Sequence, residues 1–396
     1  MQPVASIEAL VGAVKHNCHV ADARHAAAMT MCTYLLQMRE FFRWERGIAL
    51  GAALPREAVG AWLAERDALW EALAHEDYRP LPLTGAAGRA DPFDTEAVNA
   101  ALSPAGLLYG AGLVGNERPV FFIAELHSRS EREGLTVLQT GRERARTLLA
   151  PPAALAGGGA GPIVLRRESM ARWCWERTEA HAMRPRPGSA LHAMLAHYGL
   201  ERDFAAALPR WLDDQCETAV LHELGEHRLG ERWGGRWSEL RAAVAAHASR
   251  VGLAEHAAQA WRGEALVRAL RDQLADLGTT LPALLAQGND GTDGTNGAHG
   301  NGGALHAWFA GYEGLREATF PALAAGYQAW RDGDGGELLR AQCAHGRSHF
   351  EAVAATLLEA ESAPQREAAL ARFLAPPGAA GVPPSLVCDW PAGAPA

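Results

Sequence analysis

Residues 106–141 determine the fold class, because three short apolar runs follow one another there: GLLYGAGLV (106–114), PVFFIAELHS (119–128) and GLTVLQTG (134–141). The runs are rich in β-forming residues, and the segments between them, GNER and RSERE, are polar and typical of turns. Consecutive strands joined by short turns pair in the antiparallel direction. The pattern therefore predicts a three-stranded antiparallel β-meander.

The first of these runs also contains Gly110-Ala-Gly112-Leu-Val-Gly115, which matches the glycine pattern of dinucleotide-binding loops. Such a loop must lead into a helix, so that the first amides of the helix face the pyrophosphate. Here the glycines lead into the apolar run that begins at Pro119, and no strand–helix–strand unit surrounds them. We expect a hairpin at this position and no nucleotide site.

Helical periodicity dominates on both sides of the predicted meander. Before it, residues 5–15, about 19–46 and 55–77 are predicted helices, and the second is apolar around most of its circumference, as expected of a central helix. After Leu165, helical patterns resume and continue to about residue 285. The predicted fold is mostly α, with α+β character: a helical bundle-like core that carries a small three-stranded antiparallel sheet.

The predicted domain organisation follows from the segment GNDGTDGTNGAHGNGG at residues 288–303, which is too polar and too repetitive to pack a core. We expect a helical core with the inserted meander (about 106–141) over residues 1–286, followed by a flexible Gly/Asn linker at 287–303. A C-terminal helical region is then expected at 304–375, and an irregular, proline-broken tail at 376–396.

The composition narrows the classes of function. The chain has 396 residues and a net charge of −9, which argues against nucleic acid and anionic membrane surfaces as partners. No apolar run is long enough to cross a bilayer, the N-terminal segment lacks the form of a secretory signal, and the six cysteines form no CxxC pair. We therefore expect a cytoplasmic protein that, as an enzyme, acts on a small molecule. The sequence predicts no oligomeric state.

Lysine is almost absent from the chain. Lys15 is the only one, and its Val-Lys-His context excludes the Gly-Lys-Ser/Thr of a P-loop. A Schiff-base mechanism would have to use this residue. The sequence also lacks GxSxG, so an ordinary nucleophile elbow is excluded.

Three clusters combine histidine with carboxylate residues, which are ligands of transition metals. The first is HNCHVADARH (16–25), where His19, Asp22 and His25 repeat every three residues on the predicted long helix. A carboxylate three residues from a histidine can present both groups to one ion, and Cys18 adds a candidate thiolate. The alternative is structural: Asn17 or Asp22 caps the helix, and His25 packs or pairs with a carboxylate.

The second cluster lies on the helix predicted over about 209–229. Glu223 and His227 fall within the apolar arc of this helix, whereas His222 and Glu226 point away from it. A buried carboxylate must be paired, hydrogen-bonded or metal-bound, so Glu223 and His227 are predicted either to form an ion pair or to bind a metal ion. The run lacks one histidine of each of the HExxH and HxxEH signatures, so no zinc protease is expected.

The third cluster is Glu125 and His127 on the second predicted strand. Residues i and i+2 share a strand face, so this pair is expected to project together with Phe121 and Ile123. If that face covers the helical core, the pair lies in or near a metal site. If it faces water, Glu125 and His127 are ordinary surface residues.

The segment HNCH-x-ADARHA (16–26), followed by MCTYLLQMREFFRWE (31–45), resembles an uncharacterised family of bacterial proteins with no assigned activity. The segments FFIAELH (121–127) and LHELGEH (221–227) are similar to that family too, so the resemblance covers most of the chain. The resemblance implies that the three clusters belong together. It implies no reaction and no catalytic residue.

These observations favour a metal-dependent enzyme. The expected ion lies between the N-terminal helix (His19, Asp22, His25) and the later helix (Glu223, His227), with Cys18, Glu125 and His127 in or near its coordination sphere. Such ligands suit iron, manganese or zinc, as one ion or as two bridged by Glu223, and oxidoreductase chemistry is slightly preferred over metal-assisted hydrolysis. Two alternatives stay open: a metal-free helical accessory or interaction protein with buried His–carboxylate ion pairs, and a protein that binds haem noncovalently.

Overall fold

The computed structural model describes residues 7–26, 29–83, 88–114, 118–148, 151–155, 161–249, 253–287, 302–378 and 381–391. The chain forms two compact units. Unit 1 is made of Met1–Ala154 and Pro162–Ala180, and unit 2 is made of Leu155–Gly161 and His181–Ala396. Helices make up most of the described chain, so the predicted mostly α fold class is confirmed.

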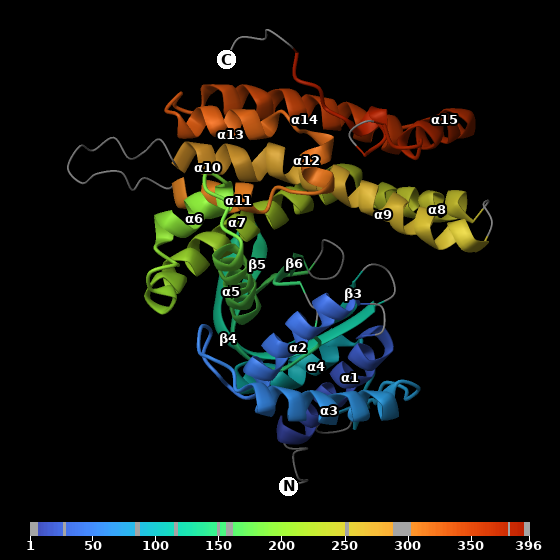
Figure 1. Cartoon of the computed structure of the whole chain (residues 1–396). Coiled ribbons are helices and arrows are strands. Elements are labelled where there is room, and N and C mark those ends of the chain that lie inside the picture. Colours follow the sequence, from blue (N-terminus) through green and yellow to red (C-terminus); the bar gives the residue numbers. More distant parts are fainter. Residues whose placement is uncertain are drawn as a thin grey trace. The chain divides into compact units, whose positions relative to one another are not determined.

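A five-stranded sheet runs through unit 1 (Figure 1). Its strand order is β3-β4-β5-β7-β6. Its strands are β3 (Leu107–Val114), β4 (Arg118–Arg132), β5 (Leu135–Arg146), β6 (Ala153–Leu155) and β7 (Ile163–Arg166). Strands β3, β4 and β5 pair antiparallel, as expected, but β7 then pairs in parallel with β5. The predicted three-stranded meander is therefore wrong in extent, since the sheet also includes β6 and β7. The sequence does not reveal these two strands, because their three or four residues are too few to show an alternating pattern.

The glycine pattern at 110–115 belongs to the β3–β4 hairpin, which pairs from Leu107↔Glu125 to Val114↔Arg118. The expected hairpin is thereby confirmed. A Cβ atom at Gly110 would lie 2.1 Å from the ring of Phe122, so only glycine lets this ring lie against the β3 backbone. A two-stranded sheet of β1 (Leu81–Pro82) and β2 (Arg89–Ala90) completes the strands of the described chain.

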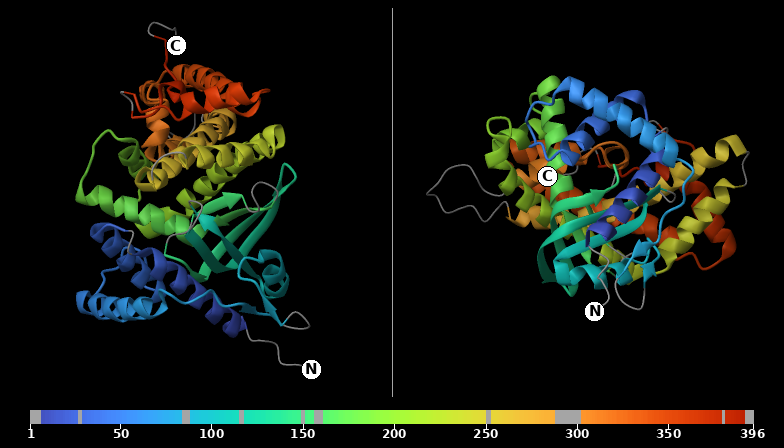
Figure 2. Two further views of the ribbon diagram at one scale, coloured as in Figure 1. Left: turned by 90° about the vertical axis from the view of Figure 1, so that its right-hand side faces the viewer. Right: turned by 90° about the horizontal axis from the view of Figure 1, so that it is seen from below.

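Helix α1 (Ile7–Ala26) lies across the sheet of unit 1 and shares a core with it that includes Val14, Phe121 and Ile123 (Figure 2). The long helix expected over about 19–46 is divided, because α2 (Met31–Glu45) begins separately with Thr30 as its N-cap. Helix α3 (Arg56–Leu73) packs against α1 and α2, and α4 (Thr95–Leu102) packs against β3. The short η2 turn (Ser103–Ala105) leads into β3, and α5 (Arg167–Met183) follows β7.

Unit 2 is an assembly of helices around one hydrophobic core, in which α9 contacts both α7 and α14 (Figure 1). Its elements are α6 (Ala190–Tyr198), α7 (Phe204–Trp233), α8 (Arg236–Ala248), α9 (Leu253–Ala275), the π-helical turn η4 (Asp276–Thr280), α10 (Leu281–Gln287), α11 (Gly302–Ala310), α12 (Leu315–Thr319), α13 (Leu323–Arg331), α14 (Glu337–Leu358), α15 (Ala363–Phe373) and η5 (Pro384–Leu386). Most of the linker expected at 287–303 lies outside the described residues, which omit 288–301.

Candidate metal centre

Two groups of side chains in unit 2 bring three metal-ligating atoms close together. Among the described residues, the groups whose ligand atoms all lie within 4.8 Å of one another are His181–His192–Glu201 and His222–Glu226–Asp272. Neither group includes a residue that the sequence predicted as a ligand. Whether either group suits a metal ion depends on how its members are already paired.

The group of His181, His192 and Glu201 forms within one short segment of chain. His181 lies in the last turn of α5, and His192 lies in the first turn of α6. Ser189 starts α6 as its N-cap, and its hydroxyl oxygen accepts a hydrogen bond of 3.2 Å from the backbone N of His192. Gly199, with a φ of +77°, ends α6 in the left-handed conformation, and the chain then turns to Glu201.

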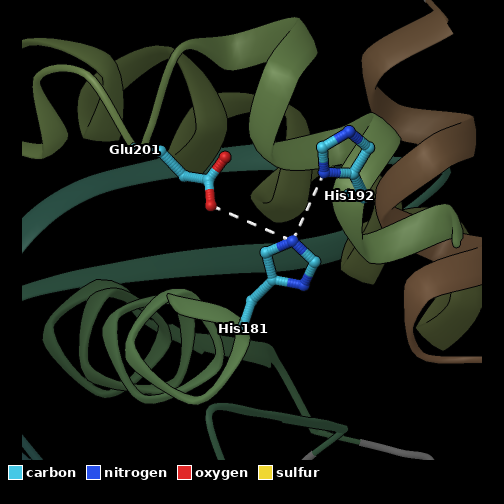
Figure 3. A group of neighbouring side chains, drawn as sticks. All are labelled: His181, His192 and Glu201. Atoms are coloured by element: carbon cyan, nitrogen blue, oxygen red, sulfur yellow. Dashed lines mark hydrogen bonds and ion pairs between the residues drawn. The ribbon is translucent and has the colours of Figure 1, made fainter. Parts of the chain in front are cut away.

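The three side chains converge, with His181 between the other two (Figure 3). His181 Nε2 lies 3.3 Å from His192 Nδ1 and 3.9 Å from Glu201 Oε1. Ligand atoms that sit about 2.1 Å from one ion at right angles are about 3 Å apart, so the observed spacing is close to that of a metal site. His181 is buried and the Glu201 side chain is 40% exposed, so one side of the group is open to solvent.

The group of His222, Glu226 and Asp272 is differently arranged. His222 Nδ1 lies 2.9 Å from Asp276 Oδ1, and its Nε2 lies 4.0 Å from Asp272 Oδ1. Burial opposes a charge on His222, but the carboxylate of Asp276 outweighs this effect and raises the pKa of His222 to about 10. The imidazole is therefore protonated at neutral pH and has no lone pair for a metal ion.

The carboxylates near His222 are also paired. Glu226 accepts a hydrogen bond of 2.8 Å from Arg271, and Asp276 accepts one of 2.5 Å from Arg316. Because each charge faces an opposite charge, this second group is a network of ion pairs that needs no metal ion. Buried His–carboxylate ion pairs of this kind are what the metal-free alternative expects. They involve His222 and Glu226, however, which the helical pattern placed on the polar side of α7.

The predicted ligands on α1 lie in unit 1 and contact groups of that unit. His19 Nε2 lies 2.9 Å from Arg66 Nη1, and burial together with this guanidinium lowers the pKa of His19 to about 4. Asp22 is 1% exposed and accepts hydrogen bonds of 2.9 and 3.0 Å from the backbone N of Leu148. Burial raises the pKa of Asp22 to about 7. His25 is half-buried near the end of α1.

The remaining candidates of unit 1 are also held by protein groups. The Cys18 thiol donates to the backbone oxygen of Phe121 at 3.6 Å, and burial raises its pKa well above the usual value. Glu125 accepts a hydrogen bond of 3.1 Å from Arg144, and His127 is exposed. Register shifts interrupt the β4–β5 ladder from Ile123 onward, so the buried alternation of β4 ends before these two residues.

Glu223 and His227 lie on α7 in unit 2. Glu223 is 8% exposed, and His227 Nε2 lies 3.6 Å from Glu231 Oε1 one turn later. These two residues belong to unit 2, whereas His19, Asp22 and His25 belong to unit 1. A single ion bound by residues of both helices therefore stays a prediction.

Models of one protein family match both halves of the chain. The N-terminal domain of a family of unknown function (DUF6866) matches residues 9–166, and the C-terminal domain of the same family matches residues 171–375. The chain belongs to this family of unknown function. Its expected membership in an uncharacterised family is thereby confirmed, and the two family domains meet close to the boundary between the units. No curated protein and no solved structure matches the chain.

The candidate ligand group of His181, His192 and Glu201 was missed by the sequence analysis. Two histidines and a glutamate occur in residues 181–201, around a turn that contains Pro185, Pro187 and Gly188. The spacing matches no known signature, and only the turn between α5 and α6 brings the three side chains together.

Among the helices that the structure describes, none has the length and apolar character needed to span a bilayer.

Proposed function

We propose that unit 2 binds a divalent transition-metal ion through His181, His192 and Glu201, and that the protein is a metal-dependent enzyme. The observation that supports this proposal is the convergence of two imidazole nitrogens and one carboxylate oxygen, at 3.3 and 3.9 Å, on a site that is open to solvent on one side. Two histidines and one carboxylate form the ligand set of mononuclear non-haem iron(II) enzymes. Iron is therefore the preferred metal, ahead of manganese and zinc.

Three protein ligands leave coordination positions for a substrate and for water. A metal ion here would supply either electron transfer to a bound substrate or Lewis-acid activation, and the ligand set favours oxidoreductase chemistry over hydrolysis. We further propose a small-molecule substrate, a cytoplasmic location, and no nucleic-acid or membrane partner. The net charge of −9 supports the last point.

This proposal changes the expected ligands and keeps the expected chemistry. His19, Asp22, His25, Glu223 and His227 are structural residues in it, as are Cys18, Glu125 and His127. The second candidate function is the metal-free accessory protein, which the ion pair between His222 and Asp276 favours because it shows buried charges satisfied without metal.

The metal content of the purified protein tests the proposal. We expect about one iron, manganese or zinc ion per chain after reconstitution, and loss of most of it in His181→Ala and in His192→Ala. Glu201→Gln keeps the size of the side chain but removes its charge, so it should weaken metal binding less. His247→Ala on α8 is the matched control, because this half-buried histidine of unit 2 belongs to neither ligand group.

Circular dichroism would verify that each variant is folded. Wild-type protein that takes up no ion, or equal loss of metal in the His247→Ala control, would exclude this site. Loss of metal in His25→Ala or His227→Ala, with retention in His181→Ala, would instead support the ligands predicted from the sequence.

A further inference from the structure

Unit 1 contains a cavity of about 930 Å³ whose walls come from α1, α2, the loop at 47–50, β5 and α5. A cavity of this size is typical of a site for a small molecule. Its lining residues all belong to unit 1, so the cavity is separate from the proposed metal ligands of unit 2.

The lining of the cavity carries an excess of positive charge. Six cationic side chains and five carboxylates line it, and the cations are Lys15, Arg43, Arg142, Arg144, Arg146 and Arg172. Most of the carboxylates are engaged by guanidinium groups. Glu40 lies 3.0 Å from Arg43 Nε, and Glu45 lies 2.7 Å from Arg66, which is outside the lining. Two arginines of the lining are paired as well, Arg144 with Glu125 at 3.1 Å and Arg172 with Glu176 at 2.9 Å. The free positive charge must therefore come from an arginine that lacks a hydrogen-bonded carboxylate.

Arg146 at the end of β5 is this kind of arginine. It is 3% exposed, and its Nε is buried without a hydrogen-bond partner among the described residues. The nearest carboxylate oxygen, Glu143 Oε2, lies 3.8 Å from Arg146 Nε, which is beyond hydrogen-bond distance. Burial and the neighbouring Arg172 lower the pKa of Arg146 to about 10, so the side chain is still charged at neutral pH.

Glu143 offsets only part of this charge, because its Oε2 lies beyond hydrogen-bond distance of Arg146 and its Oε1 is held by other groups. Its Oε1 accepts hydrogen bonds of 2.9 Å from Arg166 Nε and 2.9 Å from Ser169 Oγ. Although burial alone raises the pKa of Glu143, the guanidinium of Arg166 outweighs it and lowers that pKa. A buried guanidinium whose charge is only partly offset is costly, and an anion in the cavity would lower that cost.

Aromatic and aliphatic side chains form another part of the cavity wall. The guanidinium carbon of Arg146 lies 4.7 Å from the ring centroid of Trp44 and 5.6 Å from that of Phe41. Ile48 and Leu50 add aliphatic surface. A ligand that fits this wall has one charged end and an apolar body.

We propose that the cavity of unit 1 binds a small monocarboxylate with an apolar or aromatic body, and that Arg146 holds its carboxylate. A guanidinium matches the two oxygens of a carboxylate with two parallel hydrogen bonds. The lining has one more cation than carboxylates, which matches one negative charge better than the two of a phosphate ester. This inference is independent of the metal site.

Calorimetric titration of the full-length protein with phenylacetate, 4-phenylbutyrate and octanoate tests the proposal. We expect at least one of these acids to bind about tenfold more tightly than its uncharged amide. Arg146→Met keeps the bulk of the side chain and should weaken that binding by about tenfold or more. Arg146→Lys keeps the charge without the paired donors and should be intermediate. Arg129→Met, which removes an exposed arginine of the adjacent strand β4 that does not line the cavity, is the matched control and should bind like wild type.

Four results would overturn the proposal: no binding of any of the three acids at millimolar concentration, equal binding of acid and amide, tighter binding of inorganic phosphate than of the carboxylates, or unchanged binding by Arg146→Met. Thermal unfolding of each variant shows whether it is folded.

Lys15 provides a second readout of where the acid binds. It is the only lysine of the chain, it is exposed, and it lines the cavity. Its acetylation can be followed by mass spectrometry, with the α-amino group of the chain as an internal reference. At an acid concentration of about ten times the Kd, acetylation of Lys15 should slow about tenfold in wild type. Unchanged acetylation would place the bound acid outside the cavity.

Discussion

His181 Nε2 and His192 Nδ1 face each other at 3.3 Å, although the two imidazoles come from different helices. Their ring centroids are 5.4 Å apart, and the ring planes are inclined by 34°. Two imidazole nitrogens at this distance can share one proton or one metal ion. The carboxylate of Glu201, 3.9 Å from the same nitrogen of His181, favours a cation between them. The metal proposal for unit 2 depends on this pair.

Replacing His222 by alanine should destabilise the protein in a pH-dependent way. The substitution leaves the buried carboxylate of Asp276 without its imidazolium partner, which should lower the free energy of unfolding by about 3 kcal/mol at neutral or lower pH. The pKa of His222 is about 10 in the folded protein, against 6.5 ordinarily. Its contribution is therefore complete below about pH 6.5, declines as the pH rises, and is lost above about pH 10.

Urea denaturation of wild type and His222→Ala at about pH 6 and about pH 9.5 measures this effect. The difference in unfolding free energy between the two proteins should shrink at the higher pH. A difference that stays constant or grows would show that His222 is not held as a cation.

Replacing Gly225 by alanine should disturb the packing of α7 on α9. A Cβ atom at this position would lie 2.8 Å from the backbone oxygen of Ala275 and 2.9 Å from its Cα, and backbone atoms cannot move aside easily. We expect Gly225→Ala to lower the free energy of unfolding by about 2 kcal/mol.

Gly230→Ala is the matched control on the same helix, because a Cβ atom there would meet nothing within 4 Å. The added helix propensity should make this variant more stable, by up to about 1 kcal/mol. Both values can be measured by chemical denaturation. Equal effects of the two substitutions would contradict the close approach of α7 and α9 at Gly225.

Replacing Asp22 by asparagine should remove a pH dependence. Burial raises the pKa of Asp22 to about 7, against 3.8 ordinarily, so between these pH values the folded protein keeps a proton that the unfolded chain releases. Wild-type stability therefore falls relative to Asp22→Asn as the pH rises from about 4 to about 7, by about 1.4 kcal/mol per pH unit at most. The asparagine oxygen can still accept from the backbone N of Leu148.

Denaturation of wild type and Asp22→Asn at about pH 4.5 and about pH 8 tests this prediction. We also expect equal metal content in the two proteins. If wild type instead gained stability relative to Asp22→Asn with rising pH, the ionised carboxylate would have a stabilising partner, as a metal ligand would.

Local patterns predicted much of the fold. Strands β3, β4 and β5 were predicted because each has an apolar run and a polar turn at its end. The pairing of β7 with β5 joins residues such as Val137 and Ile163, and no local pattern indicates which distant strand is the neighbour. The break between α1 and α2 was missed because the helical period continues on both sides of Thr30.

The candidate site was less predictable, because it depends on which elements meet. The helical pattern placed His222 and Glu226 on the polar side of α7. Helix α9 nevertheless brings Asp272 and Arg271 to that side, and η4 brings Asp276. His181, His192 and Glu201 come together through the end of one helix, the start of the next and a glycine turn. Taken singly, His181 and His192 have no neighbouring sequence pattern that distinguishes them from ordinary polar residues.

X-ray absorption spectroscopy of the metal-loaded protein, at the edge of the metal it retains, counts the imidazole ligands of the proposed centre. For wild type we expect two imidazole nitrogens at about 2.1 Å and no sulfur. The metal that His192→Ala still retains should show one imidazole, and His227→Ala should keep both. A sulfur ligand, or an unchanged spectrum in His192→Ala together with a lost imidazole in His227→Ala or His25→Ala, would show that the metal binds elsewhere.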